Sequence, residues 1–480
     1  MRDEGPSLLA ERWNRGEHAL RQSITGEPRG PLCGMGSCFE CRVTEDGREH
    51  VRACMVDGEP PRAVEIPPSC QVAVVGGGPA GIAAAAAAAE CGATTLLLDE
   101  SARPGGQIWR HRGEAPKDAR SWLDRLARSG AKVASGATVF DATVEGERAL
   151  FAEVGGRAIK IAFEQLILAT GARELFLPFP GWTLPNVLGV GGAQALAKAG
   201  ADFTGRRVIL GGTGPLLFAV AALLTRVGAD VLCVLEQAPA SRLTGFACQL
   251  AASPRRLLDA ARYRLAFASV PLLTDAYVVA AHGQGRVEEV TFRAGGTERR
   301  LACDLLAVGF GLVPNLELPR HLGCAIADGF VAVDPRQRSS QLGVYCVGET
   351  TAIGGAPAAL VQGEIAARAA VGAGIPPRLL ATRDRERRFA ERLKSAFALR
   401  NELRNLAKPD TIVCRCEDVS AGAIDPAWSA RQAKLYTRAG MGPCQGRVCG
   451  PALQFLHGWS ADTVRPPLKP VTTQALEVDA

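Results

Sequence analysis

Two cysteine clusters, one near each end of the chain, constrain this sequence more than any other feature. The first is spaced C-x4-C-x2-C-x12-C and consists of Cys33, Cys38, Cys41 and Cys54. The second is spaced C-x-C-x27-C-x4-C and consists of Cys414, Cys416, Cys444 and Cys449. Four thiolates and a glycine-rich loop that offers backbone N–H groups to sulfur are what an iron–sulfur core requires. We therefore predict a 2Fe–2S cluster at each end, with zinc as the alternative metal.

A glycine-rich turn after an apolar strand carries the second strong signal, VAVVGGGPAG at residues 72–81. Gly76 permits a tight turn, Gly78 lets the backbone approach a pyrophosphate, and Gly81 lets helix and strand pack closely. The helix that follows presents free N–H groups and the positive end of its dipole to that anion. The predicted pyrophosphate-binding residues are Gly76, Gly78, Pro79, Ala80 and Gly81.

The strand after this helix ends in an acidic pair, Asp99 and Glu100. A carboxylate at that position accepts hydrogen bonds from ribose hydroxyls. Asp99 is the predicted ribose ligand, and Glu100 is the neighbouring alternative. Because strand, turn, helix, second strand and terminal acid follow in order, the segment predicts a complete nucleotide-binding unit.

A second unit of the same design begins at Arg207. It keeps Gly212 and Gly214 but has Leu217 where the third glycine belongs, which pushes the helix from the strand or changes their crossing. Its terminal acid, Glu236, favours a ribose 2′-hydroxyl over a 2′-phosphate, so NADPH is not expected. Three interpretations stay open: a working NADH site, a site for another adenine nucleotide such as ATP, and a domain that has lost its ligand.

The duplicated units predict an α/β protein with two Rossmann-like dinucleotide-binding domains and a small iron–sulfur domain at each end. A glycine-rich strand end at 343–355 is expected to return the chain to the first domain. Apolar residues at helical spacing over 381–406 predict one amphipathic helix packed on the body, with a partner or membrane surface as its alternative role. The expected division is 1–69 (first iron–sulfur segment), 70–185 and 311–375 (first nucleotide domain), 186–310 (second nucleotide domain), 376–407 (helical connector), 408–460 (helical iron–sulfur domain) and 461–480 (extended tail).

Composition excludes several classes of protein. The chain has 55 basic and 49 acidic residues, a net charge of +6, and no basic block, so no nucleic-acid partner is expected. The sequence contains no run of about 18 apolar residues, so no transmembrane segment is predicted. The first residues, MRDEGPSLLAER, lack the apolar core of a signal peptide. The odd total of 15 cysteines argues against a secreted disulfide framework. A cytoplasmic location is expected, with peripheral contact to the inner membrane through a complex as the alternative.

No catalytic side-chain set is recognisable in the sequence. Between residues 70 and 410 there is no CxxC or Cx4C pair of the kind that a disulfide reductase carries beside its flavin. The 6 histidines show no ligand or catalytic spacing. The other seven cysteines lie in apolar stretches and are expected to be buried. Electron relay through cofactors needs no catalytic side chain, so none is predicted.

Residues 70–375 resemble the two-dinucleotide-domain flavoproteins of the glutathione/thioredoxin reductase type. The stretches that carry this resemblance are PGGQ (104–107), LILATGARE (166–174) and GVYCVGE (343–349). The resemblance implies FAD in the first domain, with Glu349 in the place of the usual Asp beside the ribityl-phosphate part. The residues that it places around FAD are Gly105, Gly106, Gln107, Thr170, Gly171, Gly348, Glu349, Gly355 and Ala356.

The two cysteine segments also have recognisable relatives. The N-terminal loop is similar to that of plant-type ferredoxins, and CRCEDV with GMGPCQGRVCGP resembles the 2Fe–2S domain of bacterioferritin-associated ferredoxin. Ferredoxin domains usually begin with a β-hairpin; here we expect a truncated segment with a helix over about Ser7–Gln22 instead. Residues 417–443 are shorter than in the second family, so a helix is expected to be trimmed there.

Nearly the whole chain resembles the flavoprotein α subunit of bacterial multi-subunit amine dehydrogenases, a group that includes opine oxidase, D-hydroxyproline dehydrogenase and hydrogen cyanide synthase. The resemblance rests on PRGPLCGMGSCFECRV, LLLDESARPGGQIWR, ATGARELFLPFPGW and GETTAIGGAPAAL, together with the C-terminal motifs. It implies an electron-transfer flavoprotein that passes electrons between FAD and two 2Fe–2S clusters in a heteromeric complex.

The same resemblance implies the partners. A β subunit with its own flavin would oxidise an opine, hydroxyproline or similar substrate, a small γ subunit would complete the complex, and a downstream carrier would accept the electrons. The alternatives are a glycine dehydrogenase subunit of the hydrogen cyanide synthase type, an NADH-dependent FAD and iron–sulfur reductase, and a scaffold that binds FAD structurally.

Overall fold

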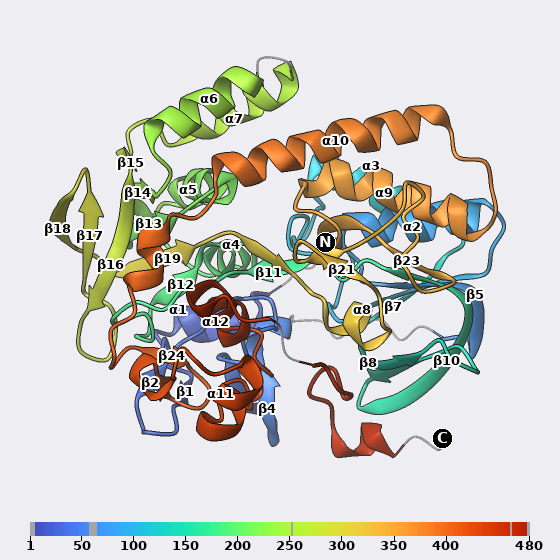
Figure 1. Ribbon diagram of the computed structural model, residues 1–480, viewed down its shortest axis with the longest axis horizontal. Helices are drawn as coiled ribbons and strands as arrows, with labels where there is room; N and C mark the ends of the chain where they lie inside the picture. The colour runs from blue at the N-terminus through green and yellow to red at the C-terminus, as the bar shows by residue number, and fades with distance from the viewer. Residues whose placement is uncertain (1–4, 57–64, 251–252, 461–462, 478–480) are drawn as a thin grey trace. The chain divides into compact units, whose positions relative to one another are not determined.

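The computed structural model describes residues 5–56, 65–250, 253–460 and 463–477. Contacts divide the chain into two units. Unit 1 comprises Met1–Gly58, Glu174–Val313 and Leu393–Asp462, and unit 2 comprises Glu59–Arg173, Pro314–Arg392 and Thr463–Ala480. The two cysteine segments and the second nucleotide domain therefore belong to one unit, and the first nucleotide domain forms the other (Figure 1). The predicted α/β class with two dinucleotide-binding folds is confirmed.

Unit 2 is built on a twisted sheet with strand order β7-β6-β5-β10-β9-β8, and β23 pairs with β10. Its strands are β5 (Ser69–Val75), β6 (Thr95–Asp99), β7 (Lys132–Ser135), β8 (Ala137–Thr143), β9 (Ala149–Val154), β10 (Arg157–Leu168) and β23 (Val344–Cys346). β5, β6, β7, β10 and β23 are parallel, whereas β8 and β9 pair antiparallel. Through β23 the chain returns to the sheet of its first nucleotide-binding unit.

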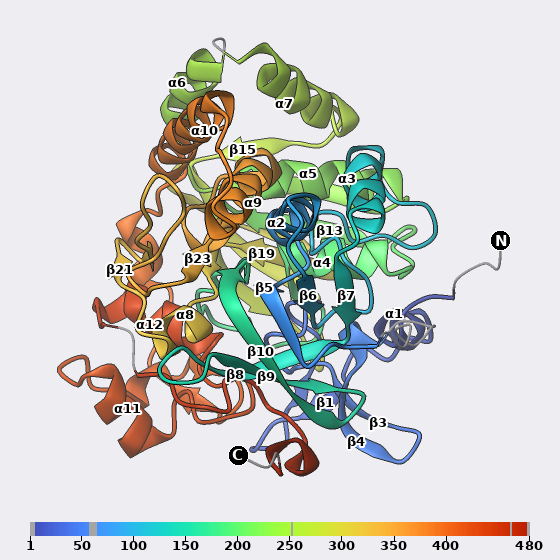
Figure 2. The same ribbon diagram turned by 90° about the vertical axis from the view of Figure 1, so that its right-hand side faces the viewer.

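Small residues bring two helices of unit 2 together. α2 (Pro79–Glu90) and α9 (Gly355–Ala370) lie side by side, as Figure 2 shows, and α3 (Lys117–Arg128) lies next to α2. A Cβ on Gly363 would lie 2.2 Å from the carbonyl oxygen of Ala80, so only glycine fits at this crossing. The run of alanines in α2 is buried and serves the same close packing.

Unit 1 contains a parallel sheet with strand order β12-β19-β13-β14-β15 and a separate antiparallel sheet, β16-β17-β18. The first comprises β12 (Val187–Gly189), β13 (Arg207–Gly212), β14 (Asp230–Glu236), β15 (Leu272–Thr274) and β19 (Leu305–Gly309). The second comprises β16 (Ala276–His282), β17 (Glu289–Ala294) and β18 (Thr297–Ala302). The helices of this domain are α4 (Val190–Lys198), α5 (Pro215–Arg226), α6 (Ala240–Leu250) and α7 (Pro254–Ala266).

The N-terminal segment differs from the sequence prediction. The helix expected over Ser7–Gln22 is shorter, α1 (Leu8–Asn14), because Gly16 adopts φ +83° just beyond it. The chain then forms a short antiparallel pair, β1 (Arg21–Gln22) with β2 (Pro28–Arg29), where no hairpin was expected. Gly26, at φ +87°, permits the turn between them. A second antiparallel pair, β3 (Arg42–Glu45) with β4 (Arg48–Arg52), follows.

The C-terminal cysteine segment combines a short strand pair with two short helices. It contains β24 (Ile412–Cys414), β25 (Val419–Ser420), α11 (Ala430–Thr437) and α12 (Cys449–His457). The shortened stretch 417–443 retains one helix, α11, which a capping box between Ser429 and Gln432 stabilises. In Figure 1 this segment lies beside β1 and β2 of the N-terminal segment, and ion pairs described below join the two.

The connector and the tail also depart from expectation. Instead of one helix over 381–406, α10 (Pro377–Ala396) ends ten residues early and a 3₁₀ turn follows at Asn401–Asn405. The helix stops because the backbone of Ala398 and Arg400 pairs with the side chain of Gln237. The tail is not simply extended: Leu468 is buried in unit 2 and a 3₁₀ turn forms at Thr473–Leu476.

The remaining helices and strands are short. They are β11 (Ala172–Glu174), β20 (Leu312–Pro314), α8 (Glu317–His321), β21 (Ile326–Ala327) and β22 (Phe330–Val331), with 3₁₀ turns at Ala53–Met55, Gly348–Thr350 and Ala421–Ala423. Within the described residues, every helix is too short or too polar to cross a bilayer.

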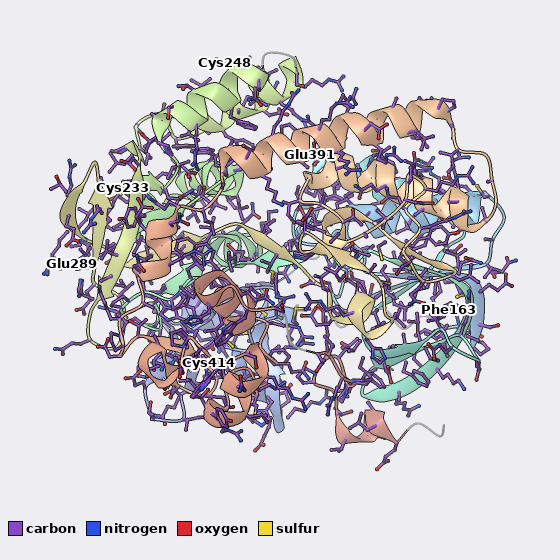
Figure 3. The ribbon with its side chains drawn as sticks, viewed as in Figure 1. Phe163, Cys233, Cys248, Glu289, Glu391 and Cys414 are labelled. Carbon is purple, nitrogen blue, oxygen red and sulfur yellow. The ribbon has the colours of Figure 1, made fainter. Side chains whose placement is uncertain are left out.

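Five of the seven cysteines outside the clusters are buried as expected: Cys70, Cys233, Cys303, Cys324 and Cys346. The expectation is wrong for Cys91 and Cys248, which are exposed. Figure 3 labels two contrasting cases, Cys233 on β14 and Cys248 on the amphipathic helix α6.

His18 is expected to make the stability of unit 1 depend on pH. Its ring lies 4.4 Å from the Trp13 ring, and burial, with Arg206 and Arg286 nearby, lowers the pKa of His18 from 6.5 to about 4. The unfolded chain therefore binds a proton at higher pH than the folded chain, so the free energy of unfolding falls as pH drops from 6.5 to 4. After allowance for solvent screening, the loss is about 2 kcal/mol. Urea unfolding at pH 7 and pH 4 measures it; a His18→Gln variant that keeps the full pH dependence would contradict it.

Candidate cofactor sites

The first glycine turn has the close contacts that its three glycines predict. A Cβ on Gly81 would lie 1.8 Å from the Gly76 carbonyl oxygen, and one on Gly76 would lie 2.2 Å from that of Ala169. A Cβ on Gly78 would meet no protein atom within 4 Å, so the space before the first turn of α2 is open. Gly78 is the N-cap and contributes no side chain to the free N–H groups of the helix. An anion therefore has both room and donors at this position.

The acid pair after β6 divides into two different environments. The Asp99 carboxylate accepts hydrogen bonds from the backbone N–H groups of Gly77 and Ser101, and burial raises its pKa. Glu100 instead forms an ion pair with Lys469 from the C-terminal tail. Asp99, which is held against the glycine turn, is therefore better placed than Glu100 for a ribose.

The other predicted flavin residues collect around the same turn. The N–H of Gly105 donates to the Gly77 carbonyl at 2.7 Å, and a Cβ on Gly106 would lie 3.0 Å from the Gly78 Cα. Gly171 and Gly355 have φ of +67° and +75°, and a Cβ on either would meet no protein atom within 4 Å. The Thr170 hydroxyl is directed elsewhere, to the carbonyl of Asn315 at 2.9 Å.

Glu349 is the clearest sign that this space is built for a polar ligand. Burial raises the pKa of its carboxyl to about 7. Its neighbour Gly348 is fixed, because the Gly348 N–H donates to the Gln362 side chain at 2.7 Å. The Glu349 residue is only partly exposed. A carboxyl withdrawn from water is stabilised by hydrogen-bond donors, and ribityl hydroxyls are such donors. The residues around this space therefore fit FAD.

The second nucleotide site differs from the first at the same positions. Leu217 is buried and Gly214 has φ +100°, whereas Gly78 has −74°, so the loop enters its helix by a different path. Glu236 is fully buried, and its carboxylate accepts from Thr213 Oγ1 at 2.7 Å and from the N–H of Gly214 at 2.8 Å. Like Asp99, this predicted ribose acceptor accepts from its glycine turn, but Glu236 is fully buried and also accepts from a side-chain hydroxyl, whereas Asp99 is partly exposed.

The connector closes around the end of β14, which the sequence did not indicate. Gln237 Nε2 donates to the Ala398 carbonyl at 3.2 Å, and the N–H of Arg400 donates to Gln237 Oε1 at 3.1 Å. Arg400 also pairs with Asp275 at 2.7 Å and stacks on Tyr277. Chain from beyond α10 thus lines the strand end where the adenosine of a dinucleotide normally binds.

The N-terminal cysteines form two close pairs. Cys33 lies against Cys38 and Cys41 lies against Cys54, and all four side chains are buried. Backbone N–H groups point at the sulfurs: Met35 and Cys38 donate to Cys33 Sγ at 3.4 Å, Gly36 to Cys54 Sγ at 3.2 Å and Glu40 to Cys38 Sγ at 3.5 Å. Such N–H···S contacts are typical of iron–sulfur loops.

The C-terminal cysteines repeat this arrangement. Cys414 pairs with Cys449 and Cys416 pairs with Cys444. Backbone N–H groups of Gly440 and Glu417 donate to Cys414, and those of Gly446 and Val448 donate to Cys444. A Cβ on Gly442 would lie 2.2 Å from the Cβ of Cys416, so glycine is required for the loop to close over the pair.

Pairs of cysteines fit a two-iron cluster better than a single ion. A structural zinc needs four ligands around one ion, whereas a 2Fe–2S centre divides its four thiolates between two irons. The geometry therefore favours 2Fe–2S over zinc at both ends.

The N-terminal loop packs against the start of α4, another feature that sequence reasoning missed. A Cβ on Gly192 would lie 2.2 Å from the Leu32 carbonyl oxygen, and one on Gly34 would lie 3.0 Å from that of Gly192. Glu174 accepts from the N–H groups of Gly191 and Gly192 at 2.8 and 3.1 Å, and burial raises its pKa to about 7. The available sequence signal for this contact was Glu174, a lone glutamate in an apolar stretch.

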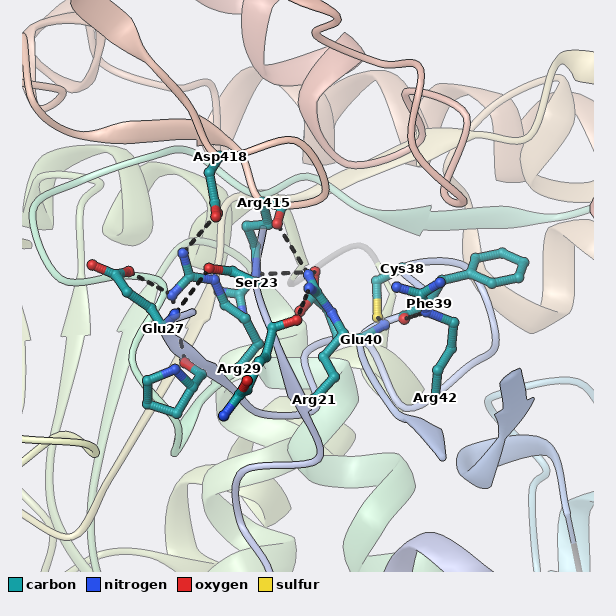
Figure 4. Close-up of polar contacts among 12 residues, drawn as sticks. Arg21, Ser23, Glu27, Arg29, Cys38, Phe39, Glu40, Arg42, Arg415 and Asp418 are labelled. Atoms are coloured by element: carbon teal, nitrogen blue, oxygen red, sulfur yellow. Dashed lines mark hydrogen bonds and ion pairs between the residues drawn. The ribbon is translucent and has the colours of Figure 1, made fainter. Parts of the chain in front are cut away.

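The two cysteine segments meet through buried ion pairs. Arg29 Nη2 lies 2.8 Å from Asp418 Oδ1, with both side chains 2% exposed. Thr25 donates to the other oxygen of Asp418 through its N–H and its hydroxyl. Figure 4 shows this contact beside a second group formed by Arg21, Glu40 and Arg415. The two segments therefore form one packed body within unit 1.

Comparison with known proteins agrees with this geometry. Residues 70–365 match the family described as pyridine nucleotide-disulphide oxidoreductase. The chain belongs to this family. Residues 3–66 match a 2Fe–2S iron–sulfur cluster binding domain, and residues 412–456 match a BFD-like 2Fe–2S binding domain. This oxidoreductase therefore binds FAD and two 2Fe–2S clusters.

Two curated relatives cover most of this oxidoreductase. An opine oxidase subunit of Rhizobium meliloti is 33% identical over 450 residues, which cover 83% of this chain and 96% of the relative. The HcnB subunit of hydrogen cyanide synthase from Pseudomonas aeruginosa is 33% identical over 420 residues, which cover 78% of this chain and 90% of the relative. The predicted relationship to the amine dehydrogenase flavoprotein group is confirmed.

Solved structures show the same fold. L-proline dehydrogenase from P. horikoshii superposes with a TM-score of 0.73 at 21% identity, over 98% of this chain and 94% of that one. Thioredoxin reductase from T. acidophilum matches with a TM-score of 0.50 at 21% identity, over 64% and 99% of the two chains. The smaller reductase lacks counterparts for about a third of this oxidoreductase.

Replacing Cys38 by serine is expected to remove the N-terminal cluster alone. The variant should lose one of two EPR signals and fall from about four irons per chain to about two, while FAD stays bound. Cys248→Ser, a change at an exposed cysteine outside both clusters, should leave iron and EPR unchanged. An unaltered EPR spectrum in the Cys38→Ser protein would refute the N-terminal ligand assignment.

Proposed function

We propose that this chain is the electron-transfer subunit of a multi-subunit amine or imino acid dehydrogenase, which relays electrons between FAD and two 2Fe–2S clusters. One observation carries the proposal: the described residues provide sites for FAD and two 2Fe–2S clusters, but no recognisable side-chain group that would react with a substrate. The described residues between 70 and 410 include no CxxC or Cx4C pair that could react with a disulfide. The chain also spans 96% of the length of the opine oxidase relative, a protein that is itself named as a subunit.

Each cofactor has a defined set of residues in this proposal. Gly76, Gly78 and Gly81 open the turn for the FAD pyrophosphate, Asp99 would accept from its ribose, and Glu349 would accept from its ribityl part. When bound, FAD would supply the chemistry that links a two-electron donor to the one-electron clusters. The proposed cluster ligands are Cys33, Cys38, Cys41 and Cys54 at one end and Cys414, Cys416, Cys444 and Cys449 at the other.

The chemistry on the substrate belongs to a partner. A flavin-containing β subunit oxidises the C–N bond, a small γ subunit completes the complex, and a quinone, cytochrome or other carrier takes up the electrons. The substrate is an opine, hydroxyproline or a similar secondary amine. Glycine is the second candidate, because the hydrogen cyanide synthase relative is as similar to this chain as the opine oxidase relative. Many cysteines without disulfide spacing suit a reducing cytoplasm.

The second nucleotide domain is not the electron entry in this proposal. Glu236 is occupied by Thr213 and Gly214, and the segment around Ala398 lines the strand end. Both features oppose an NADH site, whereas an adenine nucleotide held only for structure remains compatible with the open loop at Gly214.

An anaerobic titration of the purified chain with NADH tests this proposal. We expect no bleaching of flavin or clusters by NADH and complete reduction by dithionite. Stoichiometric bleaching by NADH would make the chain a pyridine-nucleotide reductase and overturn the proposal. In the complex purified with its β subunit, an opine, hydroxyproline or glycine should bleach the clusters; the substrate that does so identifies the amine.

A further inference from the structure

A pair of opposite charges, one from each cluster loop, joins the loops of the two clusters. Glu40 lies between Cys38 and Cys41 of the first loop, and Arg415 lies between Cys414 and Cys416 of the second. Glu40 Oε1 is 3.4 Å from Arg415 Nε, and both side chains are 1% exposed. The contact is shown in Figure 4. A charge from each cluster loop is therefore buried against the other loop.

Arg21 joins the same two loops. Its Nη2 donates to Glu40 Oε1 at 3.0 Å and to the backbone carbonyl of Arg415 at 3.0 Å. Arg415 is fixed on its other side, because Nη1 donates to the Trp182 carbonyl at 2.8 Å and the guanidinium lies 5.1 Å from the Trp182 ring centre. The charges are thus held in one arrangement rather than free to turn toward solvent.

If these buried charges served the fold alone, they would lower its stability. Glu40 Oε2 and Arg415 Nε and Nη2 are buried and make no hydrogen bond. Buried charges with incomplete hydrogen bonding cost stability, and apolar residues often replace such pairs without loss. Their field, however, acts strongly at short range in a low-dielectric interior. An electrostatic effect on neighbouring groups therefore explains the presence of these charges better than a contribution to stability does.

Both charges lie next to cluster ligands. Glu40 immediately precedes Cys41, and its backbone N–H donates to Cys38 Sγ at 3.5 Å. Arg415 stands between Cys414 and Cys416, and its side chain contacts Glu40 of the other loop. Charge beside a 2Fe–2S centre is one of the levers that set its reduction potential. The same side chains therefore act on both centres.

We propose that Glu40 and Arg415 couple the two 2Fe–2S clusters electrostatically, each setting the reduction potential of the cluster in the opposite loop as well as in its own. The clusters then form one directly communicating pair rather than two independent centres. Reduction adds a negative charge to a cluster, so a nearby carboxylate opposes it and a nearby guanidinium favours it. The proposal rests on the ligand assignment above and holds whichever amine is oxidised.

Redox titration of the full chain, followed by EPR, tests the coupling. Glu40→Gln should raise the potentials of both clusters, and Arg415→Gln should lower both, including the N-terminal one. The Cys38→Ser variant assigns the two signals. Glu45→Gln is the matched control, because it removes a carboxylate of the same segment that pairs with Arg12 and is 35% exposed. It should leave the C-terminal potential unchanged. A Glu40→Gln protein in which only the N-terminal potential shifts would overturn the proposal.

A measurement on the unmodified chain guards against variants that fail to fold. When both clusters are reduced by dithionite, their EPR signals should broaden or split relative to the half-reduced sample, and Cys38→Ser should abolish this effect. A fully reduced spectrum equal to the sum of two isolated signals would overturn the proposal while leaving the relay function intact. Fewer than about four irons per chain would instead overturn the ligand assignment, and the proposal with it.

Discussion

Replacing Gly81 by alanine is expected to abolish FAD binding and to destabilise unit 2 by about 3 kcal/mol. The new Cβ would lie 1.8 Å from the carbonyl oxygen of Gly76. The Gly76 oxygen belongs to the backbone and the Cβ position is fixed by the backbone of residue 81, so neither can rotate away and α2 must move from the end of β5. That movement displaces the free N–H groups at the start of α2 from the position that a pyrophosphate needs.

Flavin absorbance and denaturant unfolding of the purified variant measure these two effects. Gly245→Ala on α6 is the matched control: a Cβ there meets nothing within 4 Å and its φ is not positive. Alanine at that helical site should be neutral or slightly stabilising. A Gly81→Ala protein that retains stoichiometric FAD would show that the turn tolerates the shift, and would remove the steric basis of the predicted site.

The features that sequence predicted best are those that depend on neighbouring residues. The turn around Gly76 and the loop from Cys33 to Cys41 each bring their functional groups together within one short stretch. Their spacing alone therefore carries the chemistry. Spacing also identified the acid at the end of β14, Glu236. It did not reveal the hydrogen bond from Thr213 to this acid, because hydrogen bonding depends on three-dimensional contacts.

The features that sequence missed are pairings between distant residues. Glu40 and Arg415 are 375 positions apart, and each resembles an ordinary surface charge when its neighbours alone are considered. The β1–β2 pair was missed for a related reason, since strands of two residues have no measurable periodicity. Gln237 stops α10 through contacts that helical spacing around Phe389 could not reveal.

Replacing Arg29 by methionine is expected to destabilise unit 1 by about 3 to 5 kcal/mol. Arg29 is the buried cation opposite Asp418, with both side chains 2% exposed. Methionine fills similar volume but leaves the carboxylate buried without its paired cation, although the Thr25 donors remain. An uncompensated buried charge, rather than a lost attraction, is the main source of the cost.

The double variant Arg29→Met with Asp418→Asn separates these two sources. If the unpaired charge dominates, the double variant should recover most of the lost stability in denaturant unfolding, because neither segment then buries a lone charge. Arg293→Met, which removes an exposed cation paired with Glu298, should leave the midpoint unchanged. Additive losses in the double variant would instead mean that the pair itself holds the two segments together. Recovery would show that apolar packing joins them, and that the Arg29–Asp418 pair fixes how they join.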